Sequence, residues 1–375
     1  MLKSVRVEEA VGMVLCQDVT RIVPGEFKGR AFKKGHIISK EDVSELLKLG
    51  KEHIYVWQSA PGDVHEDDAA VRLARAAAGE NIACEEPREG KSSLKSTVKG
   101  LFKVNTSLLQ EINSIEDISI ASLPGDFMVE CGQNVAGARI IPLMISDSKL
   151  SRVEEMCREQ GSPFMVKRYK GLRFGIITTG SEVYKGRIKD KFGPVIKEKL
   201  AYFDAECLGQ IICTDDQGSI ESAIWNFIEK KADLIILTGG MSVDPDDVTP
   251  AAIRGTGAGI VIYGVPVQPG NMFMMAYLQG TALVGVPGCG MYYRTTILDA
   301  VLPRIFVGEL LDKSYFTAMG EGGLCSHCET LPVSQLLFLP LTRTCMGDAG
   351  FCFSGMSLVV GKGRQRQSSW YEFCC

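Results

Sequence analysis

Three uninterrupted apolar runs in the second half of the chain constrain the fold most strongly. They read LRFGIIT, ECLGQIIC and ADLIILT, and each is bounded by turn-forming residues. Helical patterns over 189–203 and 219–231 separate the runs. Apolar runs without alternation that are joined by helices are typical of buried parallel strands in βαβ units. The sequence therefore predicts an α/β domain with a doubly wound, mostly parallel sheet over 169–312, closed by a helix over 291–307.

The first part of the chain has a different pattern. Ser39 precedes an amphipathic stretch with Asp42 three residues later, which predicts a helix that starts with a capping box and stops at Gly50. Short strand-like and helical stretches follow in mixed order, so we expect a mixed α+β N-terminal region before the α/β domain. The predicted parts are a small α/β N-terminal module over 1–60, a mixed α+β region with a polar helical connector over 61–168, the α/β domain over 169–312 and a cysteine-containing tail over 313–375.

Composition and charge exclude several classes of protein. Lys and Arg total 41 against 45 Asp and Glu, which gives a net charge of −4. A protein that relies on contacts to a phosphate backbone is usually basic, so this balance argues against a nucleic-acid partner. No stretch approaches the roughly 20 apolar residues of a membrane span, and no apolar signal segment follows Met1. We expect a cytoplasmic protein without membrane association, and a homo-oligomer.

Five loops of the predicted α/β domain are rich in Gly, Thr, Ser and Asp. The first strand ends in TTGSE, the second in TDD and the third in TGGMSVDPDDVTP, and two later loops read VPVQPGNM and VGVPGCG. In open α/β sheets, ligands bind beyond the carboxyl ends of the strands. We therefore expect these loops to share one edge of the sheet and to form the ligand site.

The composition of these loops indicates an anionic ligand. Consecutive glycines, Gly239 and Gly240, let backbone N–H groups approach a phosphate closely, and the hydroxyls of Thr178, Thr179 and Ser242 add donors. A helix predicted to begin near Val248 adds a favourable dipole. Clustered carboxylates beside a phosphate are consistent with Mg²⁺ bridging the two. The carboxylates in these loops are Glu182, Asp215, Asp216, Asp244, Asp246 and Asp247.

A simpler interpretation stays open, in which Gly and Asp are turn formers and Asp residues cap helices. It is sufficient for any single loop, but turn chemistry does not require so many acids at one edge. The chain contains no Walker A sequence. Gly255, Gly257 and Gly259 alternate, but they follow a helix and precede a strand, which is the reverse of a dinucleotide fingerprint.

The order of these motifs resembles the molybdopterin-binding domain family of molybdenum cofactor biosynthesis. TGSE, an Asp-Asp pair, TGGMSVDPDDVTP, a PxQPGN loop and VPG follow one another, and the most specific part is GG-x-S-x-x-x-x-D. The resemblance covers residues 170–310. The opening VRVEEAVGMVLCQDVT also resembles the start of molybdenumtransferase-type chains. The family includes molybdopterin adenylyltransferases and molybdopterin molybdenumtransferases, so the resemblance implies molybdopterin as ligand or substrate, together with Mg²⁺ and molybdate.

The loop chemistry and the resemblance together assign candidate residues. The candidate catalytic residues are Asp247, Asp246 and Glu182. The candidate ligand-binding residues are Thr178, Thr179, Gly180, Ser181, Gly239, Gly240, Met241, Ser242, Pro269, Gly270, Asn271, Pro287 and Gly288. The candidate Mg²⁺ ligands are Asp215, Asp216 and Asp244.

Two loops depart from the molybdenumtransferase pattern. Its KPGKP becomes QPGNM over 268–272, so both lysines are replaced, and its LPGNP becomes VPGCG over 286–290. Lysine ammonium groups are natural partners for an oxyanion such as molybdate. These changes are easier to reconcile with pterin binding than with molybdate insertion.

Three functions remain open on the sequence alone. The first is an enzyme that binds molybdopterin or adenylated molybdopterin with Mg²⁺ and promotes molybdate insertion with release of AMP. The second is a non-catalytic carrier that delivers the cofactor to a molybdoenzyme client, which the missing lysines favour. The third is a nucleotide-hydrolysing enzyme on the same fold, because fold alone does not fix function.

The tail has its own composition, since six of the thirteen cysteines fall in the last 51 residues. Cys325 and Cys328 have the spacing of a metal knuckle, and Cys345 with Cys352 would complete four ligands of a zinc or iron–sulfur site. Six residues separate Cys345 from Cys352, and this spacing departs from the usual metal-knuckle pattern. A frameshifted or degenerate tail from about residue 330, and an ordinary disordered tail, are the competing hypotheses.

Deleting residues 330–375 is expected to raise the yield of soluble protein and to leave ligand affinity unchanged. The predicted helix over 291–307 already completes the α/β domain, and the apolar run LLFLPL within the deleted part favours self-association. Soluble yield and pterin affinity of the truncated chain check this. Loss of a stoichiometric metal, or of pterin binding, would show that the cysteine knuckle is functional.

Overall fold

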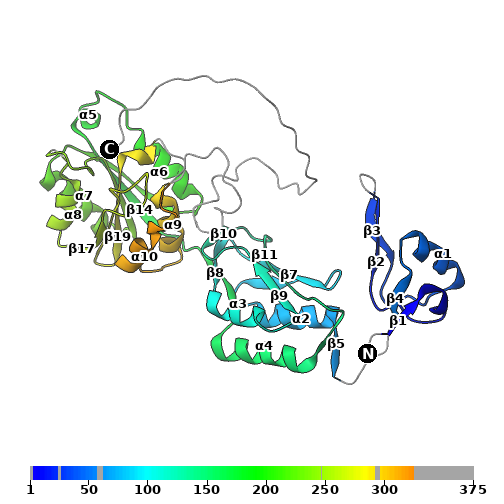
Figure 1. The fold of residues 1–375 in the computed structure, drawn as a ribbon. Helices are drawn as coiled ribbons and strands as arrows, with labels where there is room; N and C mark the ends of the chain where they lie inside the picture. The colour runs from blue at the N-terminus through cyan, green and yellow to red at the C-terminus, as the bar shows by residue number, and fades with distance from the viewer. Residues whose placement is uncertain (1–2, 24–26, 57–61, 246, 292–295, 325–375) are drawn as a thin grey trace. The chain divides into compact units, whose positions relative to one another are not determined.

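The chain forms two compact units, residues 1–168 and residues 169–375 (Figure 1). Each unit contains its own buried hydrophobic core. The structure, a computed structural model, describes residues 3–23, 27–56, 62–245, 247–291 and 296–324.

The beginning of the first unit is a small module of two antiparallel strand pairs and one helix. Its helix starts with the predicted capping box: Ser39 Oγ accepts a hydrogen bond from the N–H of Asp42, and the Asp42 carboxylate accepts one from the N–H of Ser39. Leu15, Leu46 and Ile54 belong to the core of the module. The elements are β1 (Lys3–Arg6) paired with β4 (His53–Val56), β2 (Val19–Val23) paired with β3 (Phe27–Phe32), and α1 (Lys40–Lys48).

The rest of the first unit combines two larger antiparallel sheets with three helices. The four-stranded sheet has the order β6-β7-β11-β9, formed by Ile82–Cys84, Lys91–Ser96, Asn134–Ile140 and Ile118–Ser122. The three-stranded sheet has the order β10-β8-β13, formed by Phe127–Val129, Gly100–Val104 and Phe164–Arg168. The helices are α2 (Glu66–Ala77), α3 (Thr106–Asn113) and α4 (Asp147–Gln160), and β5 (Asp63–His65) pairs with β12 (Met144–Ser146).

Helices α2, α3 and α4 lie along one side of the four-stranded sheet (Figure 1). Leu94, Ile120 and Ala138 point from three different strands into the core that these helices close. Residues 146–168 form α4 and β13 and are part of this core, although the polar sequence predicted a connector there. The reason is that Leu150 and its apolar neighbours share one face of α4, which packs against α2.

The second unit is built on one six-stranded sheet in the order β15-β14-β16-β19-β18-β17. β15, β14, β16 and β19 pair in parallel. β18 pairs antiparallel with both β19 and β17, so β17 runs in the same direction as the first four strands. The predicted doubly wound, mostly parallel α/β fold is therefore confirmed. The strands are β14 (Arg173–Thr179), β15 (Glu206–Cys213), β16 (Leu234–Thr238), β17 (Gly259–Tyr263), β18 (Met274–Leu278) and β19 (Thr281–Val286).

Helices cover both faces of this sheet, so every residue of β16 is buried. Figure 1 shows α7 and α8 on one side and α6 and α9 on the other. The closing helix begins at Ile297, later than predicted, because Thr296 caps it with a capping box that includes Asp299. None of the helices in the described ranges has the length and apolarity that a membrane span requires. The helices are α5 (Ser181–Tyr184), α6 (Phe192–Ala201), α7 (Gln217–Glu229), α8 (Thr249–Gly255), α9 (Ile297–Phe306) and α10 (Lys313–Thr317).

An ion-pair network joins α2 to α4 and predicts acid sensitivity of the first unit. Arg72 lies 2.7 Å from Glu154 and 2.6 Å from Asp147, and its hydrogen bonds hold the pKa of both carboxyl groups below their usual range. A depressed pKa contributes stability that is complete above the unfolded pKa and is lost as the pH falls through the folded value. The advantage in melting temperature of the wild type over Arg72→Met should therefore shrink between pH 6 and pH 3.

Arg158→Met is the matched control, because it removes one exposed ion pair, with Glu155, from α4. It should change the melting temperature little at any pH. An equal loss of stability in Arg72→Met at pH 6 and pH 3 would contradict the prediction.

Candidate functional site

Four strand ends meet at the carboxyl edge of the second unit's sheet. Thr179 lies opposite Cys213, Thr178 lies opposite Thr238, and Thr238 in turn lies opposite Val286. The loops that follow these four strands therefore begin side by side. The fifth predicted loop begins at the same edge, because Tyr263 at the end of β17 lies opposite Met274, which in turn lies opposite Gly285. The structure thus places all five predicted loops at one edge.

Gly239 and Gly240 make a close approach to the neighbouring strand end. Both have left-handed backbone conformations, with φ of +89° and +55°. A Cβ on Gly239 would lie 2.4 Å from the carbonyl oxygen of Thr179, and one on Gly240 would lie 2.8 Å from Thr249 Oγ1. At Gly239 the obstacle is backbone, so only glycine fits. The pair therefore lies directly beside the strand that leads into Gly180.

Buried threonines hold this edge together from below. Thr178 Oγ1 accepts hydrogen bonds from Gln210 Nε2 at 2.9 Å and from Thr238 Oγ1 at 3.3 Å, and Thr179 Oγ1 lies 3.3 Å from Thr249 Oγ1. The threonines are at most 4% exposed. The sequence suggested that Thr178 and Thr179 donate directly to a ligand. Their burial places them beneath the loops, where they fix the loop geometry.

The loop after β14 is tied to the loop after β15. The N–H of Ser181 donates to Asp215 Oδ2 at 2.8 Å. A Cβ on Gly180 would lie 2.9 Å from Glu182 Oε1, so this carboxylate folds back toward the strand end. The structure thus brings Gly180, Ser181, Glu182 and Asp215 together.

Asp216 has a structural partner of its own. Its carboxylate accepts hydrogen bonds from the N–H and the Oγ of Ser219, both at 2.8 Å, and so caps α7. These hydrogen bonds lower the pKa of Asp216. For this acid the interpretation as a helix cap describes the observed contacts. Asp215 and Asp216, although adjacent in sequence, therefore have different partners.

The loop after β16 is anchored by Tyr263, which the sequence did not single out. Its hydroxyl donates to the carbonyl oxygens of Met241 at 3.0 Å and Ser242 at 3.3 Å. Its ring lies 5.3 Å from the guanidinium of Arg254. Burial raises the pKa of Tyr263, the Arg254 charge opposes the rise and the Asp247 carboxylate adds to it. The charge of Asp247 therefore acts on the hydroxyl of Tyr263.

The acids of the same loop lie near its tip. Val243 is 83% exposed, and Asp244 beside it is also exposed. The carbonyl oxygen of Asp244 accepts a hydrogen bond from the N–H of Asp247 at 2.9 Å, which closes a tight turn. Asp247 is partly buried, whereas Asp246 lies outside the described residues. The loop therefore presents carboxylates beside the glycine pair.

The two remaining loops differ in what they contact. A Cβ on Gly270, which has a φ of +115°, would lie 3.4 Å from Ile297, so this loop packs on the start of α9. Gly288 is exposed in a short 3₁₀ turn directly after β19, at the shared edge. The predicted ligand-binding residues in these loops are Pro269, Gly270, Asn271, Pro287 and Gly288.

The described acids do not form a metal cage by themselves. In the parts of the chain that the structure describes, no group of three or more His, Cys, Asp or Glu side chains is placed to hold a metal ion. Mg²⁺ usually keeps several waters and binds one or two carboxylates together with phosphate oxygens of a ligand. Glu182, Asp215 and Asp247 suit that arrangement, in which the ligand completes the site. Cys325 and Cys328 lie outside the described residues.

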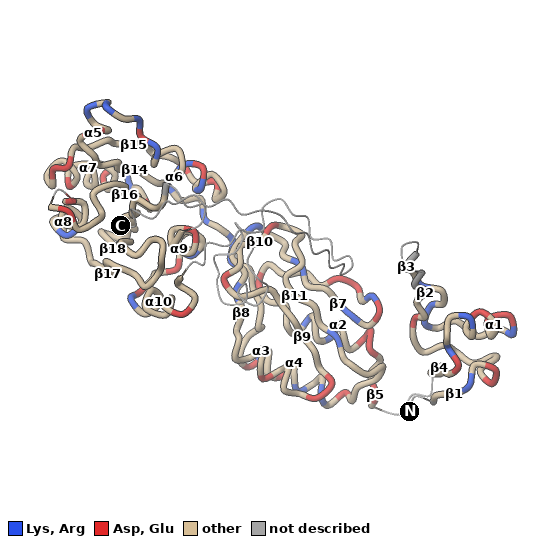
Figure 2. Tube along the Cα trace, turned by 45° about the horizontal axis from the view of Figure 1, so that its top comes forward, with Lys and Arg blue, Asp and Glu red and all other residues tan. Residues whose placement is uncertain are grey.

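A group of cations follows α5 and was not predicted as part of the site. Figure 2 shows Lys and Arg gathered along this loop. The sequence signal is the run KGRIKDK, which begins one residue after α5. Cations near this edge are suitable partners for an anionic ligand. The exposed cations are Lys185, Arg187, Lys189 and Lys191.

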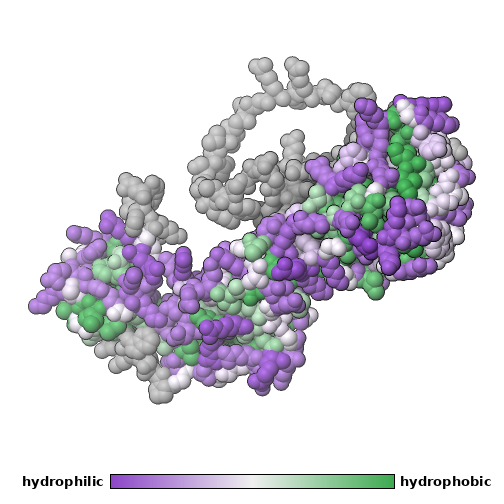
Figure 3. Space-filling model, turned by 180° about the vertical axis from the view of Figure 1, so that it is seen from behind, coloured by the Kyte–Doolittle hydropathy of each residue, from purple (hydrophilic) through white to green (hydrophobic). Residues whose placement is uncertain are grey.

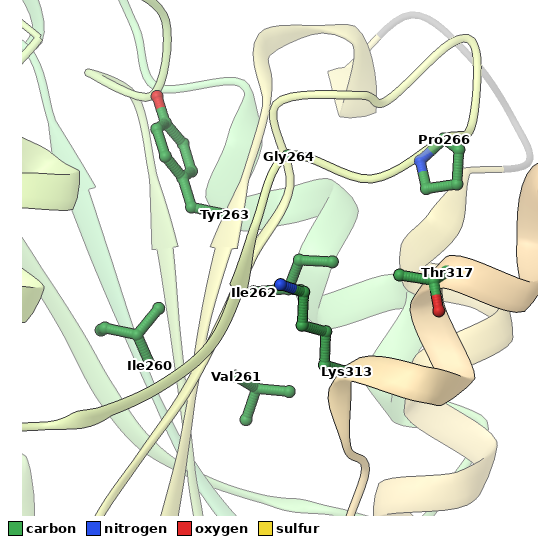
Figure 4. A pocket seen from close by; sticks show the side chains of 8 residues that line it. All are labelled: Ile260, Val261, Ile262, Tyr263, Gly264, Pro266, Lys313 and Thr317. Atoms are coloured by element: carbon green, nitrogen blue, oxygen red, sulfur yellow. The ribbon is translucent and has the colours of Figure 1, made fainter.

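Two grooves lie on the second unit. One, of about 420 Å³, adjoins the carboxyl edge and is lined by residues that include Tyr184, Ile212 and Asn226. The other, of about 570 Å³, lies along β17. Figure 4 shows Lys313 extending beside Ile262 there, while the ring of Tyr263 points away from them. Figure 3 shows a band of hydrophobic surface on one face of this unit.

Comparison with known proteins identifies the second unit. Residues 175–306 match the family model described as a probable molybdopterin binding domain. This segment belongs to that family. The molybdopterin-binding domain covers the six strands and the five loops at the carboxyl edge of the sheet, and it is a domain of the molybdenum cofactor biosynthesis type. Residues 4–58 match a separate model, a domain of unknown function.

Similar curated proteins have two different names. A CinA-like protein of Mycobacterium sp. (strain JLS) is 37% identical over 81 residues, which are 22% of this chain and 19% of that protein. A molybdopterin molybdenumtransferase of Haemophilus influenzae is 28% identical over 149 residues, which are 37% of this chain and 36% of that protein. The matched segments thus span about a fifth to a third of these relatives.

Solved structures of similar proteins include two from molybdopterin biosynthesis. The enzyme MoaB of Thermus thermophilus has a TM-score of 0.30 and 20% identity, and the match covers 37% of this chain and 98% of that chain. The MoeA protein of Pyrococcus horikoshii has a TM-score of 0.31 and 12% identity, with 82% and 75% covered.

Gly239→Ala is expected to destabilise the molybdopterin-binding domain by about 3 kcal/mol or more, because the new Cβ meets a backbone carbonyl in addition to the left-handed φ. Gly257→Ala is the matched control. Its φ is +81° and nothing lies within 4 Å of the added Cβ, so it should cost only about 1–2 kcal/mol. Denaturant unfolding of both variants measures the difference. Equal losses would mean that the contact with Thr179 does not constrain the loop.

Proposed function

We propose that the second unit binds molybdopterin or adenylated molybdopterin and promotes molybdate insertion in molybdenum cofactor biosynthesis. The observation that carries the proposal is the glycine pair of the molybdopterin-binding domain, Gly239 and Gly240, packed beside the loop that starts at Gly180. Close approach of backbone N–H groups at such a place suits a phosphate. A molybdopterin molybdenumtransferase among the similar proteins supports the reaction.

Each group at the edge has a role in this proposal. The backbone of Gly239 and Gly240 would receive the phosphate, and the exposed cations after α5 would balance its charge. Glu182 and Asp247 would orient the reacting phosphate and, with ligand oxygens, hold Mg²⁺. Mg²⁺ would supply charge neutralisation at the leaving phosphate. No covalent nucleophile is required.

A carrier function is the second candidate, and one observation favours it. Gln268 and Asn271 replace the two lysines of the molybdenumtransferase pattern. Both residues are exposed, so neither is a buried substitute for the lost charge. A carrier would hold the cofactor and pass it to a molybdoenzyme client without releasing AMP.

The experiment that tests the proposal incubates the full chain with adenylated molybdopterin, Mg²⁺ and molybdate and follows AMP by chromatography. AMP that appears only with molybdate is the expected result. Tight binding without AMP would favour the carrier. AMP release that is independent of molybdate would favour a nucleotide-hydrolysing enzyme, and no binding at all would overturn the proposal.

Asp247→Asn should reduce molybdate-dependent AMP release by about 100-fold or more and shift the melting temperature by only a few degrees, because a partly buried carboxylate at a loop turn contributes more to orientation than to folding. Asp233→Asn is the control, since Asp233 lies at the opposite edge of the sheet and accepts from the N–H of Arg173. Global unfolding of the Asp247→Asn protein would instead mean that this acid is a structural cap.

A further inference from the structure

The four-stranded sheet of the first unit has a second face, opposite α2, α3 and α4, and a groove of about 460 Å³ lies on it. Side chains of the strands alternate between the two faces, so Ser119, Gly137 and Arg139, which lie between core positions, reach this groove. The residues that line it and matter here are Lys91, Ser119, Ala121, Ser122, Gly137 and Arg139.

The floor of the groove is made of very small residues. Gly137 lies opposite Ser93 on one side and opposite Ala121 on the other. Glycine within a strand weakens a sheet, and it often marks a place where another group approaches the backbone closely. A Cβ on Gly137 would lie 2.5 Å from Cε of Lys91. The glycine therefore lets the Lys91 side chain lie down across the floor.

Two cations face each other directly at one end of this floor. Lys91 and Arg139 are cross-strand partners in the register of β7 and β11, and like charges in that position destabilise a sheet. Neither forms an ion pair with any described residue. Arg139 Nε donates to the carbonyl oxygen of Ile140 at 3.2 Å, so its other N–H groups can face outward. A local arrangement that costs stability without compensation is expected at functional sites.

Two neighbouring charges show that this pair is unusual. Lys95 lies on the same strand, and it forms an ion pair with Glu85 at 2.5 Å. Glu66 interacts electrostatically with Arg139. Burial and the charge of Asp67 raise the pKa of Glu66, and the Arg139 charge opposes the rise. Glu66 nevertheless stays beyond ion-pair distance of Arg139. Lys91 and Arg139 thus have no carboxylate at ion-pair distance, whereas Lys95 has Glu85.

We propose that this groove binds a small organic phosphate. The guanidinium and the ammonium together match the two or three oxygens of a phosphate group, and the hydroxyl of Ser119 with the amide of Asn134 adds donors along the groove. The volume is within the range of small-molecule sites. This site is in the other unit from the molybdopterin-binding domain and does not depend on its function.

The test uses inorganic phosphate and AMP as probes on the full chain. Amide hydrogen exchange should show protection of 118–122 and 134–140 with either probe, and calorimetry gives the affinity. Lys91→Gln/Arg139→Gln should weaken binding at least tenfold and leave the melting temperature equal or higher, since it removes like charges. Lys95→Gln, the control cation on the same strand, should change the affinity less than twofold.

Four results would overturn the proposal. The first three are no protection of the two strands at millimolar probe, an equal loss of affinity in Lys95→Gln, and binding of a hexaglutamate peptide to the groove without binding of either phosphate. AMP protection confined to 178–181 and 239–242 would also overturn it. That last outcome would leave the proposed function of the second unit intact, so the two proposals fail separately.

Discussion

The contact between Gly239 and the carbonyl oxygen of Thr179 is the constraint on which the candidate site depends. Parallel pairing places the strand ends side by side, but two loops can meet only if one of them carries no side chain at the contact. Thr249 reinforces it, because its hydroxyl donates to the carbonyl oxygen of Gly239 at 2.9 Å. Because these links are buried, the exposed part of each loop is free to bind a ligand.

Charge is distributed unevenly in this acidic chain. In the second unit, acids lie at the tips of the loops while cations gather after α5, which suits a ligand that brings phosphate and metal together. In the first unit, Lys91 and Arg139 face each other without a carboxylate. Both units therefore present cations where the net charge of −4 gives no hint of them. Local pairing, rather than total charge, indicates where anions can bind.

Much of the fold could be predicted because its signals are local. The apolar runs predicted the parallel strands, and the Ser39 and Asp42 pattern predicted the start of α1. Residues 146–168 were expected to be a connector because their composition is polar, although only one helical face decides burial. β18 (Met274–Leu278) was not predicted, because it contains no β-branched residue, although Pro269-Gly270 precedes it and Gln279-Gly280 follows it. Its antiparallel place in the sheet comes from its pairing with β19 and β17.

The sequence by itself determined the family of the second unit and the strands that carry its loops, because strand periodicity and motif order are properties of neighbouring residues. Tertiary structure alone decided what each polar group does. Thr178 is buried beneath the loops, and Asp216 caps the start of α7. Tyr263 donates a hydrogen bond to Ser242, which lies 21 residues before it in the chain. Strand register alone set Lys91 against Arg139. These outcomes depend on contacts between residues far apart in the chain, and a linear pattern does not contain them.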